Sequence, residues 1–312
     1  MKLAYIFPGQ GAQYVGMGSE LRQKYPAAAK VFQEADEVLG YGLSELCFTG
    51  PAETLRLTYH TQPAILTTSV AALFVFAELA EVQPVCTAGH SLGEYTALVG
   101  SGMLDFASAV KLVHLRGKWM DEAVPAGVGA MSAVLGMDRD VLAAVCSQAS
   151  GEDEVAQLAN INCPGQIVIS GTTAAVASAG ELAKEHGAKR VIPLDVSGPF
   201  HSSLMKPASE RLRQALVDTR FTPTDIPVVQ NVDAALRRDP DAVRKGLEEQ
   251  LFQSVLWEDD VRTMLELGVD AFVEFGPGTV LSGLVRKIAR GIPTYHVEDE
   301  ASLRQTLQAV RG

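Results

Sequence analysis

A serine flanked by two glycines is the first candidate for chemistry in this sequence. The segment AGHSLGE, residues 88–94, follows a short apolar run and precedes a helix-like stretch. Gly-x-Ser-x-Gly between a strand and a helix is the pattern of a nucleophile elbow, a tight turn that lifts the serine hydroxyl clear of the sheet. The Leu92 amide and the helix N-terminus then face an oxygen that becomes negative. The pattern favours acyl transfer by Ser91, and a turn without catalytic function is the alternative.

A serine hydroxyl needs a base, and the six histidines of the chain supply the candidates. His90 is next to Ser91 in the turn, where successive side chains diverge. The segment SGPFHS, residues 197–202, places His201 in a loop between a predicted strand and a predicted helix, where catalytic side chains are often carried. No aspartate or glutamate stands out as its partner, so a Ser-His dyad oriented by a backbone carbonyl and a triad both fit the sequence.

An arginine in an apolar setting indicates what the serine attacks. On the helix predicted after the elbow, the residues three and four positions from Arg116 are Leu112, Val113, Trp119 and Met120. Arg116 should therefore point inward, where its planar guanidinium needs a partner and matches a carboxylate with two hydrogen bonds. We expect a substrate with a carboxylate. An arginine that covers apolar surface with its stem, or pairs with a structural acid, is the alternative.

An α/β framework must position these side chains. Residues 3–7 form an apolar run closed by Pro-Gly, as in a buried strand of a parallel sheet. Pro63 lies near the first turn of one predicted helix, and Asp105 is a candidate N-cap of another, which Pro125 and nearby glycines end. Helices are predicted at residues 17–39, 64–79 and 106–123.

The segment that follows has a different order of elements. Between residues 126 and 195, strand and helix patterns alternate as β-α-β-β-α-β, the order of a ferredoxin-like unit. Helix and strand patterns of α/β type resume after it. We therefore expect a large α/β-hydrolase-like domain with a parallel sheet core, residues 1–125 and 196–312, into which a small ferredoxin-like domain, residues 126–195, is inserted.

Composition excludes several functional classes. The 312 residues carry a net charge of −11, which argues against a nucleic-acid partner because phosphate binding needs a broad basic face. The four cysteines form neither a metal motif nor a disulfide framework, so we expect no metal and buried free thiols. The N-terminal apolar stretch is too short for a signal peptide, and no run approaches the roughly 18 apolar residues of a membrane span. A cytoplasmic protein without a membrane partner is expected.

Five motifs occur in order over essentially the full length of the chain. They are PGQGAQ at residues 8–13, GHSLGEY at residues 89–95, Arg116, GPFH at residues 198–201 and EFGPG at residues 274–278. Together they closely resemble the malonyl-CoA:acyl carrier protein transacylases. The resemblance implies Ser91 as the nucleophile and His201 as its base. It further implies an oxyanion hole formed by the Gln10 and Leu92 amides, and Arg116 as the clamp on the malonyl carboxylate.

The resemblance also implies a residue that orients His201 and a preference among acyl groups. Gln250 matches the position whose main-chain carbonyl orients the histidine in this family. Phe200 resembles the bulky aromatic residue of malonyl-selective relatives, which crowds the α-carbon where a methyl branch would sit. Because a pocket distinguishes one methyl group by only about 1–3 kcal/mol, the implied preference for malonyl need not be absolute.

The implied reaction is a ping-pong transfer of malonyl from malonyl-CoA, through an acyl-serine, to the phosphopantetheine thiol of acyl carrier protein, without a cofactor. Fatty acid biosynthesis is the expected pathway, and a free-standing acyltransferase that serves a polyketide synthase is the alternative. A hydrolase with the same elbow and a non-catalytic docking module fit these residues less well. We expect a monomer. An acidic carrier requires a local basic patch, and two clusters are candidates: Lys189 with Arg190, and Arg286 and Lys287 with Arg290.

Overall fold

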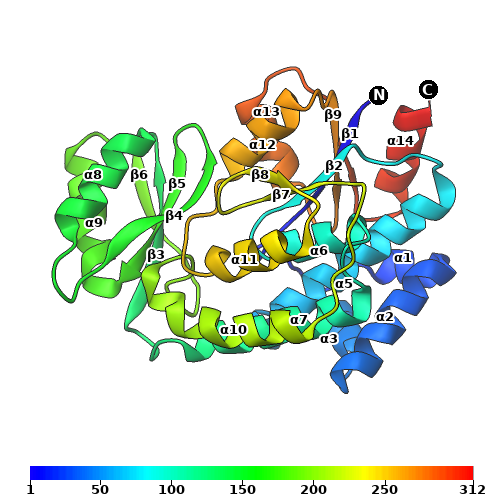
Figure 1. Cartoon of the computed structure of the whole chain (residues 1–312), viewed down its shortest axis with the longest axis horizontal. Helices are drawn as coiled ribbons and strands as arrows, with labels where there is room; N and C mark the ends of the chain where they lie inside the picture. The colour runs from blue at the N-terminus through cyan, green and yellow to red at the C-terminus, as the bar shows by residue number, and fades with distance from the viewer. Residues whose placement is uncertain (312) are drawn as a thin grey trace.

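The protein is built on two β-sheets (Figure 1). The computed structural model describes residues 1–311. The larger sheet has the strand order β10-β9-β1-β2-β7-β8, in which every neighbouring pair is parallel except β7 and β8. This parallel core confirms the predicted α/β class. Its strands are β1 (Leu3–Phe7), β2 (Cys86–Gly89), β7 (Val228–Gln230), β8 (Ala235–Arg237), β9 (Ala271–Phe275) and β10 (Thr294–Val297).

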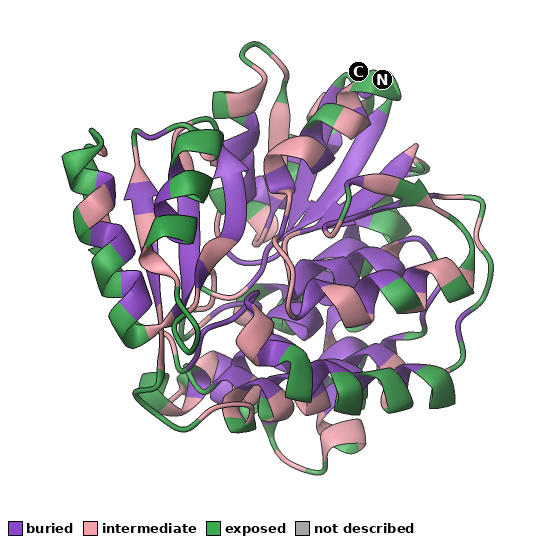
Figure 2. Ribbon diagram, turned by 60° about the vertical axis from the view of Figure 1, so that its left-hand side comes forward, coloured by how far each residue is buried: buried purple, intermediate pink, exposed green. Residues whose placement is uncertain are grey.

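Both faces of the larger sheet are buried, which explains the unbroken apolar run of β1. Leu3, Tyr5 and Phe7 face a core shared with α2 (Pro26–Leu39), α5 (Thr58–Leu79) and α7 (Phe106–Glu122). Ala4 and Ile6 face the opposite core, under α12 (Trp257–Glu266) and α13 (Val280–Ile288). Figure 2 shows the resulting layers, with buried strands in the middle and exposed helix faces outside. The remaining helices are α1 (Ser19–Lys24), α3 (Leu43–Thr49), α4 (Ala52–Leu55), α6 (Gly93–Gly100), the 3₁₀ helix η1 (Ser203–Met205), α10 (Lys206–Asp218), α11 (Pro240–Gln250) and α14 (Glu300–Arg311).

Two of the predicted helices have other limits. The stretch at residues 17–39 is divided into α1 and α2 at Tyr25, which is extended because it precedes a proline. The helix expected from residue 64 begins at Thr58, so Pro63 lies inside it. Pro63 has no N–H to donate to the carbonyl of Tyr59 four residues earlier. The His114 ring nitrogen Nδ1 lies 2.9 Å from that carbonyl oxygen and occupies the vacant position.

Helices α5 and α7 approach closely, and this contact brings Gln62 beside Arg116. Asp105 caps α7 as predicted, because its side chain accepts a 2.9 Å hydrogen bond from the Ser108 amide. Gly117 lies at the crossing, where a Cβ atom would be only 2.7 Å from the Tyr59 Cα. A larger residue at this position would therefore push the two helices apart.

The smaller sheet is antiparallel, with the order β4-β5-β3-β6. Its elements follow the predicted β-α-β-β-α-β order: β3 (Gly129–Leu135), α8 (Arg139–Ala149), β4 (Ala156–Cys163), β5 (Gln166–Thr172), α9 (Thr173–Glu185) and β6 (Arg190–Pro193). Helices α8 and α9 cover one face of this sheet, and Met131 and Val168 on the other face join the core of the larger sheet. We propose that residues 126–195 form the inserted domain, and these boundaries stay a prediction.

Helix α5 differs from the expectation that no segment resembles a membrane span. It is long and apolar enough to cross a membrane, but 78% of its most apolar window is buried against the rest of the chain. Such burial is typical of the central helix of a globular core. The four cysteines are buried and free, as predicted.

Gly93 lies where the turn after β2 crosses β1, and its substitution tests this close approach. A Cβ atom would lie 2.1 Å from the Phe7 carbonyl oxygen, which the parallel sheet holds in place. We expect Gly93→Ala to lower the free energy of unfolding, measured by urea denaturation, by about 1–3 kcal/mol or more. Gly283→Ala, inside α13 and next to open space, is the matched control and should be neutral or stabilising by up to about 1 kcal/mol. Equal stabilities of Gly93→Ala and the wild type would contradict the close approach.

Candidate active site

Ser91 occupies the sharp turn between β2 and α6. Its φ of 51° lies in the left-handed region, which costs a non-glycine residue on the order of 1–3 kcal/mol. The Asn231 side chain holds both sides of the turn: its Oδ1 accepts from the Ser91 amide at 2.8 Å, and its Nδ2 donates to the Gly89 carbonyl at 2.8 Å. These two hydrogen bonds help to keep the strained turn in place.

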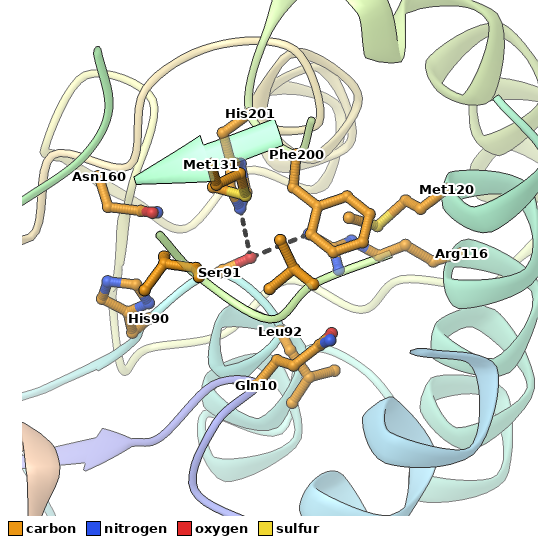
Figure 3. A pocket seen from close by; sticks show the side chains of 12 residues that line it. Gln10, His90, Ser91, Leu92, Arg116, Met120, Met131, Asn160, Phe200 and His201 are labelled. Carbon is orange, nitrogen blue, oxygen red and sulfur yellow. Dashed lines mark hydrogen bonds between the residues drawn. The ribbon is translucent and has the colours of Figure 1, made fainter. Parts of the chain in front are cut away.

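His201 lies beside the Ser91 hydroxyl (Figure 3), with 2.7 Å between Nε2 and Oγ. On the other side of the ring, Nδ1 is 2.8 Å from the Gln250 carbonyl oxygen. A carbonyl only accepts, so Nδ1 carries the proton and the lone pair of Nε2 faces Ser91. Of the two arrangements that the sequence left open, these contacts fit the dyad with a backbone carbonyl, and its catalytic role stays a prediction.

The protonation of His201 is governed by its surroundings. Burial, and then the positive charge of Arg116, lower the pKa of His201 to about 3. The imidazole is therefore neutral near pH 7 and free to accept a proton.

Arg116 points inward, as its apolar neighbours predict, and is only 1% exposed. Within residues 1–311 its hydrogen bonds all go to neutral oxygens: Gln62 Oε1 at 2.8 Å, Gln250 Oε1 at 2.9 Å and Ser91 Oγ at 3.1 Å. The Tyr95 ring lies 5.6 Å from the guanidinium carbon. Burial lowers the pKa of Arg116, with the nearby Tyr95 and Glu94 acting in the opposite direction. The site thus contains a buried cation without a directly bonded carboxylate.

Two main-chain amides near Ser91 are free to bind an oxyanion. Gln10 follows β1, and Leu92 precedes α6; both residues line the cavity around Ser91. Neither amide donates a hydrogen bond within the described part of the chain. Free amides stabilise negative charge on an oxygen, and the Leu92 amide does so at the start of α6.

The cavity at Ser91 is small and largely apolar. Its volume of about 110 Å³ is below the roughly 300–1,000 Å³ of pockets for drug-sized ligands. Figure 3 shows Phe200 and Met120 next to Arg116, on the opposite side of Ser91 from His90. The His90 Nε2 is 2.8 Å from Asn162 Oδ1 and is directed away from the serine hydroxyl. The cavity therefore suits a short acyl group that ends in an anion.

Sequence comparison with known proteins identifies the family of this chain. A family model described as an acyl transferase domain matches residues 4–303. The malonyl CoA-acyl carrier protein transacylase of Bacillus subtilis is 51% identical over 310 residues, which are 99% of this chain and 98% of that protein. The Escherichia coli K12 protein of the same name is 44% identical over 307 residues, 98% of this chain and 99% of that one. The chain belongs to the malonyl-CoA:acyl carrier protein transacylase family.

Solved structures of malonyl transacylases share this fold. The acyl carrier protein S-malonyltransferase of Vibrio cholerae has a TM-score of 0.96 and 46% identity, covering 98% of this chain and all of that one. A malonyl-transacylase solved in complex with its type II polyketide synthase acyl carrier protein has a TM-score of 0.96 and 43% identity, covering 99% of this chain and all of that one. As a malonyl-CoA:acyl carrier protein transacylase by family, the chain is an acyltransferase.

The residues that the sequence singled out lie close together in this transacylase. Gln10, Ser91, Leu92, Arg116, Phe200 and His201 line one cavity, and Gln250 contacts three of them. Their roles stay predictions. Sequence analysis missed Gln62, which bonds Arg116, and Asn231, which bonds the Ser91 amide. A signal existed for Asn231, since it directly follows β7 and polar residues at the carboxyl ends of parallel strands commonly form sites. Within residues 1–311, no group of metal-ligating side chains occurs.

The low pKa of His201 predicts a dependence of stability on pH. The folded-state pKa of about 3 lies below the ordinary value of 6.5, so the unfolded state binds this proton more readily and stability falls as pH decreases below about 6.5. His201→Asn removes this contribution. Between pH 7 and pH 5, the free energy of unfolding of the wild type should therefore fall by about 2 kcal/mol more than that of the variant. Urea denaturation at both pH values measures the difference. The control is His186→Asn at an exposed histidine, and identical losses in His201→Asn and the wild type would contradict the assignment.

Proposed function

We propose that this enzyme carries the malonyl group on Ser91 between malonyl-CoA and the phosphopantetheine thiol of acyl carrier protein. One observation carries the proposal: the Ser91 hydroxyl lies 2.7 Å from a neutral histidine and 3.1 Å from a buried guanidinium that binds no carboxylate of residues 1–311. A nucleophile, a base and an anion-binding group therefore meet at one oxygen. The thioester is a substrate, and the reaction needs no cofactor.

In the first half-reaction, His201 Nε2 takes the proton of Ser91 as Oγ attacks the thioester carbonyl. The negative oxygen of the tetrahedral intermediate accepts hydrogen bonds from the Gln10 and Leu92 amides, and each donor contributes on the order of a hundred- to a thousandfold in rate. The carbon–sulfur bond then breaks, the coenzyme A thiolate takes the proton from His201, and malonyl-Ser91 remains.

Arg116 selects the acyl group and also affects the base. A malonyl carboxylate fits the guanidinium with two hydrogen bonds and replaces its contact with the serine hydroxyl. Because the Arg116 charge depresses the pKa of His201, a bound carboxylate raises that pKa and makes His201 a stronger base. Phe200 borders the same cavity and crowds the α-carbon, which disfavours a methyl branch.

In the second half-reaction, the carrier thiol replaces coenzyme A and follows the same steps in reverse. A second cavity shares Gln10, His90, Asn160 and Leu194 with the first and extends to Gln166. This cavity provides a route for the phosphopantetheine arm to Ser91.

The two basic clusters predicted from the sequence approach each other near Gln166. Lys287 donates a 3.0 Å hydrogen bond to Gln166 Oε1. Across the smaller sheet, Leu135 pairs with both Gln166 and Arg190, and Lys189 packs on the adjoining turn. Lys189, Arg190 and Lys287 are exposed, and none forms an ion pair within residues 1–311. We call these three residues the basic rim and propose that it docks the acidic carrier.

The proposal also covers the metabolic pathway, the oligomeric state and the cellular location of the enzyme. We place the enzyme in fatty acid biosynthesis. A polyketide synthase is the second candidate, because a relative 43% identical was solved with such a carrier protein. We also propose that the enzyme is a monomer. Four free thiols and a net charge of −11 support a cytoplasmic enzyme without a membrane or nucleic-acid partner.

Intact mass after incubation with acyl-CoA tests the acyl-enzyme. The wild type should gain one malonyl group from malonyl-CoA and one acetyl group from acetyl-CoA, and Ser91→Ala should gain neither. Arg116→Ala should lose malonylation by at least about tenfold more than acetylation, because only malonyl carries the carboxylate. Equal losses would count against the clamp, and rapid release of free malonate without an adduct would indicate a hydrolase.

Charge reversal tests the basic rim. We expect Arg190→Glu with Lys287→Glu to reduce kcat/KM for acyl carrier protein by about tenfold, since opposite charges accelerate association. Transfer to free pantetheine, an uncharged thiol, should be unchanged, which separates docking from chemistry. Lys111→Glu, an exposed lysine on α7, is the matched control. A double variant with normal kcat/KM for the carrier would remove the rim as the docking site.

A further inference from the structure

A buried carboxylate lies one side chain away from Arg116 and takes no part in the mechanism above. Glu94 is fully buried at the start of α6. Its Oε2 accepts a 2.9 Å hydrogen bond from Gln250 Nε2, while Gln250 Oε1 accepts a 2.9 Å hydrogen bond from Arg116. The Gln250 amide therefore joins the guanidinium to the carboxylate, with its carbonyl toward the cation and its N–H toward the anion.

The hydrogen bonds of Glu94 fit the ionised carboxylate. Oε1 accepts from Gln230 Nε2 at 2.7 Å, and Oε2 accepts from the Asn231 amide at 2.9 Å as well as from Gln250. Each of these partners is a donor, so a protonated carboxyl would direct its own hydrogen at another N–H. On balance burial raises the pKa of Glu94, and the three donors and Arg116 offset part of this rise, so the donor geometry is the observation that favours the ionised form.

The other buried acid in this region is not an equivalent partner. Asp260 accepts one hydrogen bond, at 2.8 Å from Asn231 Nδ2, and its Oδ1 has no partner within residues 1–311. Burial raises the pKa of Asp260 well above its usual range. Glu94 is therefore the buried negative charge that is connected to Arg116.

We propose that Glu94, acting through the Gln250 amide, is the permanent counter-charge of Arg116 and weakens its hold on the substrate carboxylate. A transferase must bind the malonyl group and then release it to a second thiol. A guanidinium without any counter-charge would stabilise malonyl-Ser91 too strongly, because Coulomb attraction is large in a buried site. Glu94 is a positioning and charge-setting residue that touches no substrate. The inference rests on the proposed function, in which Arg116 binds the carboxylate.

The measurable consequence concerns the acylation equilibrium. In this equilibrium, enzyme and acyl-CoA react to give acyl-enzyme and free coenzyme A. Intact mass measures the acylated fraction of the enzyme at fixed ratios of coenzyme A to acyl-CoA. We expect Glu94→Gln to shift this equilibrium toward malonyl-enzyme by about tenfold. The acetyl equilibrium should stay within about twofold of the wild type, since acetyl has no charge for Arg116 to hold.

The hydrogen bonds around Glu94 allow this neutral substitution. Gln230 Oε1 has no partner within residues 1–311, so turning over the Gln230 amide provides an acceptor for the new N–H group, at the cost of the 3.1 Å hydrogen bond from Gln230 Nε2 to the Val243 carbonyl. Glu94→Asp keeps the charge and should preserve the wild-type ratio of malonyl to acetyl equilibria. Glu249→Gln removes a partly exposed charge next to Gln250 and is the matched control. A purely structural role of Glu94 would change both acyl equilibria alike.

If Glu94→Gln does not fold, a second variant that adds a negative charge beside Arg116 still tests the inference. Gln62 Oε1 already accepts from Arg116, so Gln62→Glu adds a second counter-charge there and should lower the malonyl-enzyme fraction with little change for acetyl. An unchanged malonyl equilibrium in Gln62→Glu or in Glu94→Gln would overturn the inference, as would equal shifts in Glu94→Asp and Glu94→Gln. If Arg116→Ala loses malonyl selectivity while these variants stay like the wild type, the proposed function stands and this inference alone fails.

Discussion

The site depends on a positive charge that is enclosed in the protein and is bonded to no carboxylate of the described residues, 1–311. Arg116 cannot lose its proton under ordinary conditions, so its surroundings must supply oxygen atoms in fixed positions. They come from three separate parts of the chain: Gln62 on α5, Ser91 on the elbow and Gln250 at the end of α11. The packing of these elements therefore determines whether the guanidinium is held ready for an anion or left without partners.

The parallel sheet supplies only part of this arrangement. The carboxyl ends of β1, β2 and β7 lie side by side, and Gln10, Ser91 and Asn231 lie in the loops that begin at these ends. His201 and Gln250 come from segments outside the sheet. Gln250 connects them to it, since its main-chain carbonyl bonds His201 while its side chain bonds Arg116, Ser91 and Asn231. A shift of the end of α11 would thus displace the base and the anion-binding group together.

The sequence predicted features whose causes are local. The glycines around Ser91, the cap at Asp105 and the apolar neighbours of Arg116 each act within one turn of chain, and the structure has the corresponding turn, helix start and inward side chain. Contacts between distant segments carried no such signal. Gln62 is 54 residues from Arg116, and its position depends on how closely α5 and α7 pack. The sequence did not indicate that α5 begins before Pro63. The Tyr59 carbonyl, which receives no hydrogen bond from Pro63, is bonded instead by His114 of another helix.

The two sheets contribute different kinds of residue to the cavity. Met131 and Leu194 come from β3 and the segment after β6, and they form wall surface beside Ser91 and Leu92, which follow a strand of the larger sheet. Wall residues tolerate changes of size, whereas the strained turn at Ser91 does not. Substitutions at Met131 and Leu194 can therefore reshape the wall of the cavity while the strained turn at Ser91 keeps its conformation. The smaller sheet is therefore the place to adjust the room for an acyl chain, whereas Arg116 and Phe200 lie outside that sheet.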